Sequence, residues 1–348
     1  MNKKNHNEMG HSKYTWSETK KDALQYDTDE FDSEEETDME ADIDYDMLFG
    51  KYLMEAAAVG DVDRASRILK TFEYETECLN EIYHGTTVLC AAAAHGRRSI
   101  VKLIIDHGAD VNGEDEKEDT PLIVAVKANH ERTALLLYDK YDADAELTDK
   151  KGFDAFYYAA RGGLAQLTRK FIDELKFDPE KPYGPDSDTA WHAAARHGRT
   201  EVMHAMLKYV PDLDVTNEDD ESALDIAIKY GRLGVCATLL NLCRHADVNR
   251  CDVDDVTPLS KAIDAFFASP RGSARSDTAL AIVKLLVSKS AEIDMKMGDG
   301  TSALEKAAKM TNPATDGRLL ELFKKNSFAD GMAGRKRDLA VFEADVKM

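Results

Sequence analysis

The chain has 348 residues, of which 43 % are hydrophobic, and it carries a formal net charge of −21 at pH 7. A negative charge of this size repels phosphate at long range, which disfavours nucleic acid as a partner. No apolar run reaches the length of a membrane span and the first residues are polar, so we expect no membrane insertion and no secretory signal.

Residues 1–46 are predicted to form an acidic tail that does not fold by itself. The stretch from Asp27 to Asp46 holds twelve acidic residues and no basic one, with too few apolar side chains to offset the entropy cost of ordering. Ser33, followed by three glutamates, is a candidate site for an acidophilic kinase. Whether the tail regulates the protein or is only a solvated run of charge stays open.

A helical hairpin is predicted at residues 85–112, and its pattern recurs along the chain. Its two apolar runs, at 88–94 and 100–105, each end at a His-Gly pair, where glycine can close a helix with a positive φ. One hairpin cannot bury its apolar side alone and needs stacked copies. The copies start at residues that each stand two positions before a large apolar residue: Thr87, Thr120, Asp154, Thr189, Ser222, Thr257 and Ser302.

The spacing of these copies, 33 to 35 residues with one interval of 45, resembles that of the ankyrin repeat. The residues that carry the resemblance are Thr120-Pro121-Leu122, Thr257-Pro258-Leu259 and Thr189-Ala190-Trp191-His192, with Ala-Asp-Val-Asn endings at 109–112 and 246–249. The resemblance implies an all-α solenoid of stacked helix-turn-helix repeats joined by short β-turn or hairpin connections. We place this domain at residues 47–326, beginning with a capping helix pair, and a C-terminal tail with a basic cluster and a possible short helix at 327–348.

Two departures from the regular pattern concern the turn and the core. The turn glycine of Gly85, Gly152 and Gly300 is replaced elsewhere, and Glu118 suits a left-handed backbone less than Asp220 and Asp255 do. Phe156 and Trp191 stand where leucine is usual, so we expect a core reshaped around two rings, with help from Tyr157 and Tyr158.

A third departure is the 45-residue unit, whose excess contains a segment rich in serine, proline and glycine. We expect residues 269–276 to form an exposed loop between the two helices of that hairpin. Whether this loop has a function stays open.

No motif of a known catalytic or metal site occurs, and the five cysteines lack metal-site spacing. We therefore expect no cofactor, no metal and no enzymatic activity. His95, His107 and His197 precede glycines at helix ends, where the ring can hydrogen-bond exposed carbonyls. His192 stands where the ankyrin family ties adjacent hairpins together by hydrogen bonds. Unpaired cysteines suit a reducing compartment, so we expect a cytoplasmic protein, with the nucleus or a host-cell cytosol as alternatives.

What remains for function is a surface, and the resemblance implies that a partner is bound on the concave face by turn tips and inner-helix ends. The candidate tip residues are Tyr83, His84, Lys150, Lys151, Phe153, Asp186, Glu218 and Asp219. The candidate inner-helix residues are Lys127, Arg161, Arg196 and Lys229, which share one repeat position, with His197 and Tyr230 one residue further on. The shared basic position is either a stripe that binds the partner or a residue type that is common at this position of the repeat.

These features predict a non-catalytic scaffold that binds another protein and is a monomer without that partner. The alternative is a host-targeted effector or targeting subunit whose repeats recruit a substrate for a separate enzyme. The acidic tail is a candidate regulator, because it can compete with the partner for the bases of the concave face.

Overall fold

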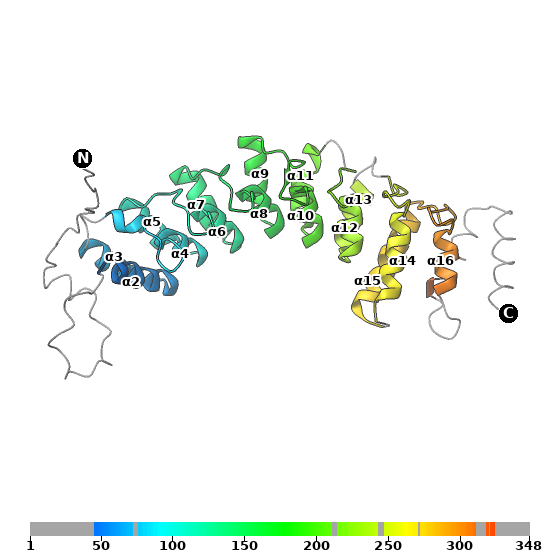
Figure 1. Cartoon of the computed structure of the whole chain (residues 1–348), viewed down its shortest axis with the longest axis horizontal. Coiled ribbons are helices and arrows are strands. Elements are labelled where there is room, and N and C mark those ends of the chain that lie inside the picture. The colour runs from blue at the N-terminus through cyan, green and yellow to red at the C-terminus, as the bar shows by residue number, and fades with distance from the viewer. Residues whose placement is uncertain are drawn as a thin grey trace, which may run out of the picture. The chain divides into compact units, whose positions relative to one another are not determined.

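A computed structural model describes residues 45–71, 76–210, 214–242, 247–270, 272–310, 318–319 and 321–323. The predictions for the acidic tail up to residue 44, for Cys243 and for the tail at 327–348 lie outside these residues. The chain divides into two compact units. The first unit ends at Asp144, and the second unit begins at Ala145. Both are built of paired helices, as an all-α ankyrin-type solenoid requires (Figure 1).

The first unit holds three helix pairs. Its inner helices, α2 (Tyr45–Val59), α4 (Val88–Ala94) and α6 (Pro121–Lys127), pack in sequence, and so do its outer helices, α3 (Val62–Thr71), α5 (Arg98–Asp106) and α7 (Glu131–Tyr141). A short 3-10 helix, η1 (Thr76–Asn80), packs on α2 and α4. The helix pair predicted before the first regular repeat is therefore confirmed.

The second unit continues the same arrangement. Its inner row is α8 (Ala155–Gly162), α10 (Ala190–His197), α12 (Ala223–Lys229), α14 (Pro258–Ala268) and α16 (Ala303–Met310). Its outer row is α9 (Ala165–Lys170), α11 (Thr200–Met206), α13 (Leu233–Leu242) and α15 (Ala274–Ser288), with the π-helical turn η2 (Phe171–Leu175) after α9 and the 3-10 turn η3 (Leu207–Tyr209) after α11.

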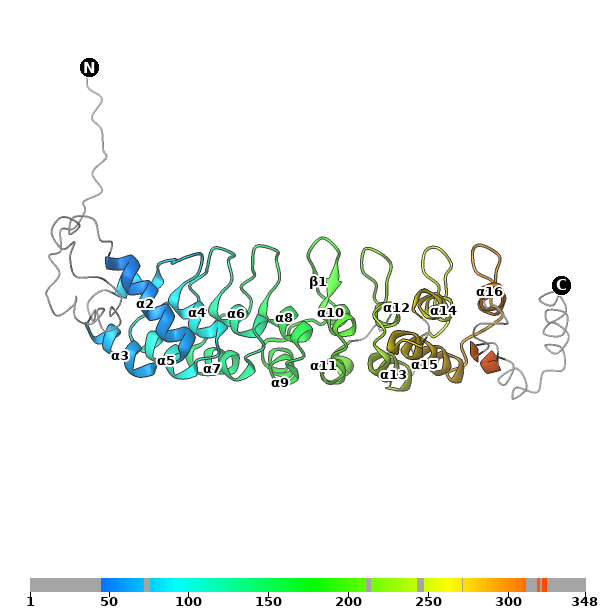
Figure 2. The same ribbon diagram turned by 90° about the horizontal axis from the view of Figure 1, so that it is seen from below.

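The turns before the inner helices are hairpins. One of them forms the antiparallel strands β1 (Pro182–Tyr183) and β2 (Asp188–Thr189), with Pro182 opposite Thr189. In both units the turns leave the inner helices on the side away from the outer helices (Figure 2).

The residue predicted to start each repeat is the N-cap of its inner helix, directly before the first helical residue. Its side-chain oxygen caps the helix. Thr87 Oγ1 accepts a hydrogen bond from the Cys90 amide at 3.2 Å, and Asp154 Oδ1 accepts one from the Tyr157 amide at 2.9 Å. Such caps satisfy backbone N–H groups that have no partner inside the helix. The same bond is present at Thr120, Thr189, Ser222, Thr257 and Ser302.

In each of these turns, the residue two positions before the cap has a left-handed backbone. Besides the three glycines, Glu118 (φ 57°), Asp220 (φ 54°) and Asp255 (φ 56°) adopt it, so the turn forms in spite of the glutamate. Ser187 (φ 51°) occupies the same position in the hairpin of β1 and β2. This role of Ser187 was not predicted from the sequence.

A second set of bonds ties four of the hairpins to the hairpin that precedes each of them. The side chains of Arg97, His130, Arg199 and Arg232 each lie 2.9–3.0 Å from a backbone carbonyl oxygen in the last turn of the preceding inner helix. Each of these side chains passes over a glycine, at which an added Cβ would lie only 2.8–3.2 Å from it. Those glycines are Gly60, Gly96, Gly163 and Gly198, and all four also have positive φ.

The core of the second unit is built around the two predicted rings and further aromatic side chains. Phe156 and Trp191 are both fully buried. The ring that stacks on Phe156 is Phe177, with centroids 5.2 Å apart. Tyr157 and Tyr158 are buried as well and contact Phe153, so the expectation that they take part in this core is confirmed.

The long repeat is also corrected by the structure. Its extra residues lengthen the helices: α14 and α15 have 11 and 15 residues. Ser273 caps α15 by accepting a hydrogen bond from the Ser276 amide at 3.2 Å, and Ser276 is buried. Residues 274–276 therefore form the first turn of a helix and are not part of an exposed loop.

Histidines at the helix ends behave as predicted in two cases. Nδ1 of His95 lies 2.8 Å from the Ala91 carbonyl oxygen, and Nδ1 of His107 lies 2.7 Å from that of Leu103. His192 joins two hairpins through Nε2, 3.0 Å from the Val215 carbonyl oxygen, as the resemblance implied. Burial lowers the pKa of His192, which keeps the ring neutral in this role.

Candidate partner-binding surface

A groove opens between two successive turns of the first unit. Its volume is 610 Å³, and its walls are the turns at 84–86 and 115–119. The floor comes from α4 and α6 and consists of small side chains, among them Ala91, Ala94 and Ala128. These three alanines are only half-buried, so their side chains are accessible from the groove.

Charged groups line the groove as well. Lys127 forms an ion pair with the buried Asp119, and His84 and His95 are exposed. Below them, the Cys90 thiol lies 3.5 Å from the Asp119 carbonyl oxygen, and burial raises its pKa to about 12. Cys90 is therefore a neutral part of the floor and not a reactive thiolate.

In the second unit, two of the predicted inner-helix bases are neutralised inside their own repeat. Arg196 pairs with Asp188, with 3.1 Å between Nη2 and Oδ1, and Lys229 pairs with Glu221 at 2.6 Å. Burial opposes the charge of Arg196, but Asp188 outweighs it and the pKa of the guanidinium is raised. Lys127 of the first unit is paired in the same way. These contacts favour the interpretation that a base at this position is a recurrent feature of the repeat sequence and not a binding stripe.

The remaining base of that position, Arg161, is exposed and lies over an aromatic cluster. Its guanidinium is 6.0 Å from the centre of the Tyr158 ring. Phe153 packs at 4.4 Å from Tyr157 and 6.1 Å from Tyr183 between ring centres. Phe153 is half-buried, so this predicted tip residue holds the turn against the inner helix while it shows one side to solvent.

Tyr83 was expected to be an exposed tip residue, and this was wrong. Its side chain is 6 % exposed, and its hydroxyl donates a hydrogen bond to the Cys78 carbonyl at 3.0 Å. An added Cβ on Gly50 would lie 2.4 Å from the ring, so Tyr83 is packed directly on α2. It serves the fold of the first unit.

The other predicted tip residues are exposed. Asp186 accepts a hydrogen bond from the Glu218 amide at 3.0 Å through its carbonyl, and the Glu218 carboxylate accepts one from Ser187 at 3.0 Å, which joins two successive turns. Lys150, Lys151 and Asp219 are exposed as well.

The last two predicted inner-helix residues lie near arginines. Tyr230 is 45 % exposed, and the Arg196 guanidinium is 5.8 Å from its ring centre. His197 is half-buried, and burial together with the arginines around it lowers its pKa.

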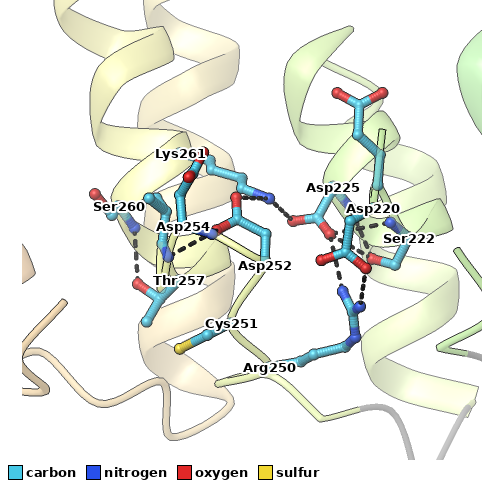
Figure 3. Close-up of polar contacts among 12 residues, drawn as sticks. Asp220, Ser222, Asp225, Arg250, Cys251, Asp252, Asp254, Thr257, Ser260 and Lys261 are labelled. Atoms are coloured by element: carbon cyan, nitrogen blue, oxygen red, sulfur yellow. Dashed lines mark hydrogen bonds and ion pairs between the residues drawn. The ribbon is translucent and has the colours of Figure 1, made fainter. Parts of the chain in front are cut away.

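An ion-pair network that was not predicted from the sequence lies at the junction of the hairpins of α12 and α14 (Figure 3). Asp225 is 3 % exposed and accepts from Lys261 at 2.9 Å, and Lys261 also pairs with Asp252 at 2.8 Å. Arg250 approaches Asp220 at 3.0 Å and Asp225 at 3.7 Å. All these groups are engaged with each other, so the network fixes the two hairpins together.

No cluster of three or more His, Cys, Asp or Glu side chains that could hold a metal ion is found among the described residues. Within those residues there is likewise no helix with the length and apolar character needed to cross a bilayer.

Comparison with known proteins agrees with this architecture. A family model described as ankyrin repeats (3 copies) matches residues 53–151 and 156–252, more than half of the chain. The human transient receptor potential cation channel subfamily A member 1 is 30 % identical over 184 residues, 51 % of this chain and 16 % of the channel subunit. An ankyrin repeat and KH domain-containing protein of Caenorhabditis briggsae is 28 % identical over 178 residues, 48 % of this chain and 6 % of that protein.

A third relative is alpha-latroinsectotoxin-Lt1a of Latrodectus tredecimguttatus, 30 % identical over 132 residues, 38 % of this chain and 9 % of the toxin. The chain thus spans a small fraction of the length of each of these relatives. Ankyrin repeats are typically non-catalytic modules of protein interaction. With its capped hairpins and its match to the family model, this chain belongs to the ankyrin repeat family.

Proposed function

We propose that this protein is a non-catalytic scaffold that binds one partner protein through its turns and inner helices. The observation that carries the proposal is the groove of the first unit, with its floor of small side chains between two turns. An apolar side chain of a partner would displace water from that floor, and His84 and Lys117 at the rim would contact its polar neighbours. Binding by Lys150, Lys151, Arg161, Tyr230 and the acidic tips of the second unit is part of the same proposal.

A groove-filling substitution tests this function. Ala91 stands four residues after the cap, a position that other repeats fill with Val124, Tyr158 or Lys261. We therefore expect the fold to tolerate Ala91→Tyr, with the new ring in the groove. We expect partner affinity to fall about tenfold or more, roughly 1.4 kcal/mol, in calorimetric titration with the purified partner.

The control for this experiment is Arg132→Tyr, which places the same ring at an exposed position of α7. It should leave both the melting temperature and the partner affinity unchanged. Equal affinity for wild type and Ala91→Tyr, at equal stability, would show that the partner does not use the groove.

We further propose that the acidic segment 27–46 competes with the partner. It is joined directly to α2, which packs against α4 at the floor of the groove. Each exposed ion pair that it forms would contribute only about 0.2–1 kcal/mol, so the competition should be weak and sensitive to salt.

A second candidate function is that of a targeting subunit, whose repeats recruit a substrate to a separate enzyme. The matched stretches make up 16 % or less of the relatives described above, so in those proteins the repeats are one part of a longer chain. The two functions predict different complexes. The scaffold binds one partner protein, whereas a targeting subunit binds an enzyme and its substrate together.

A further inference from the structure

A second pocket of the first unit shares no residue with the groove. It lies between the turn that joins α2 to α3 and the beginning of α5, and its volume is 390 Å³. Its lining includes Val59, Val62, Arg97, Arg98, Ser99 and Lys102. The pocket is therefore formed by the junction of two consecutive helix pairs and not by the turn tips.

All the charged residues that line this pocket are positive. They are Arg97, Arg98 and Lys102, and no acidic side chain lines it. Arg98 and Lys102 are exposed and stand one helical turn apart on α5. Among the described residues, neither has an ion pair, in contrast to the paired bases of the inner helices.

Arg97 is held in place by the preceding helix pair. Its Nη2 and Nε donate to the Ala58 carbonyl oxygen at 2.9 and 3.3 Å, and the guanidinium passes over Gly60. An added Cβ at Gly60 would lie 3.2 Å from Nε. One edge of the planar guanidinium is fixed by this contact, and its remaining N–H groups stay available for a ligand.

We propose that this pocket binds a phosphate monoester carried by a serine or threonine of a partner protein. Such a group has a charge of about −1.5 to −2 and three strong acceptor oxygens. Three cations and the exposed Ser99 hydroxyl provide donors for those oxygens. A carboxylate has one charge and would leave part of this positive potential without a counterpart.

The surroundings of the pocket favour a peptide as the carrier of the phosphate. Val59 is 75 % exposed and Val62 is 39 % exposed, and both line the pocket. They offer apolar contact to a residue next to the phosphorylated one. An anionic bilayer is disfavoured because the net charge of −21 repels an extended negative surface, whereas one phosphate senses the nearby cations.

The test is a binding measurement with the full chain. A fluorescent pool of nine-residue peptides with a central phosphoserine is titrated by fluorescence polarisation, beside the same pool with unmodified serine. We expect saturable binding of the phosphorylated pool only, weakened about tenfold or more by Arg98→Ala combined with Lys102→Ala. Inorganic phosphate should compete, and it should shift the NMR signals of residues 97–102.

The control is Arg132→Ala, which removes an exposed arginine from α7 of the same unit. It should not change the affinity, and since Arg98 and Lys102 have no described side-chain contact, all variants should melt together. Equal binding of both pools, or binding that survives the double substitution, would overturn the proposal. Phosphatidylserine vesicles that bind through the same residues while the peptide pool does not would assign the pocket to membranes instead.

Discussion

The turn position two residues before each helix cap requires a left-handed backbone, with φ between 51° and 86° in all seven turns. Glycine meets this requirement at three of them without a steric penalty. The others carry Glu118, Ser187, Asp220 and Asp255. For a glutamate or serine the left-handed conformation costs roughly 1–2 kcal/mol, and the stacking of neighbouring hairpins must offset it.

This cost gives a prediction for Glu118. The Glu118→Gly substitution should raise the free energy of unfolding by about 1 kcal/mol, because it removes the steric penalty of the left-handed backbone. The greater conformational entropy of glycine in the unfolded chain offsets only part of this gain in stability. The side chain is exposed, and no hydrogen bond or ion pair of its carboxylate is found within the described part of the chain. Urea denaturation followed by circular dichroism measures the change.

The reverse substitution, Gly152→Glu, is the matched control. Nothing lies within 4 Å of a Cβ added at Gly152, whose φ is 77°. Its penalty is therefore that of the backbone alone, and it should lower the stability by a similar amount. Two changes of the same sign would refute the explanation.

At the scale of the element, what the sequence predicts are the helix starts. Thr120 and Thr257 are followed by proline and then leucine, and the capping bonds they make are local, within three residues. The hydrogen bonds from the Arg199 and Arg232 side chains to the preceding inner helix join residues 38 and 36 positions apart, and no local sequence pattern marks them. Tyr83 was misjudged for the same reason, since its burial depends on Gly50, 33 residues earlier.

The candidate site was predicted only in part. The repeat position of Lys127, Arg196 and Lys229 was visible in the sequence, but their pairing with acids eight residues earlier was not. The groove and the pocket at Arg98 depend on the spacing of stacked helices, which no single repeat contains. A sequence signal for the network of Figure 3 does exist, because Asp225 follows the cap Ser222 by three residues.

That network supplies the prediction at this scale. Lys261→Met leaves the 3 % exposed Asp225 without one of its two basic partners, and it should cost roughly 3 kcal/mol. Lys229→Met breaks the more exposed pair with Glu221 and should cost at most about 1 kcal/mol. Urea denaturation of both variants is the measurement, and equal losses would mean that the network does not hold the two hairpins together.

At the scale of the whole molecule, charge is distributed unevenly. Twelve acidic residues stand between Asp27 and Asp46, and the exposed tips of the second unit add Asp186, Asp219 and Asp254. Many bases of the described residues are paired, whereas Arg98 and Lys102 are not. An acidic protein with a few unpaired bases selects partners by electrostatics, which acts on association rates and on salt dependence more than on the fold.

The acidic segment gives the last prediction, which separates its effect on stability from its effect on binding. The first helix begins at Tyr45, and its core residues Phe49 and Leu53 follow that point. Removal of residues 1–44 therefore takes away no described core residue, and the melting temperature at 0.15 M salt should stay within a few degrees.

At low salt the shortened chain should bind its partner more tightly than the full chain, because the acidic segment no longer competes for the same basic side chains. The difference in affinity between the two chains should vanish near 0.5 M salt, where charges more than about 4–5 Å apart are screened. A clear loss of melting temperature would show that the segment packs on the repeats, and equal affinities at low salt would refute the competition.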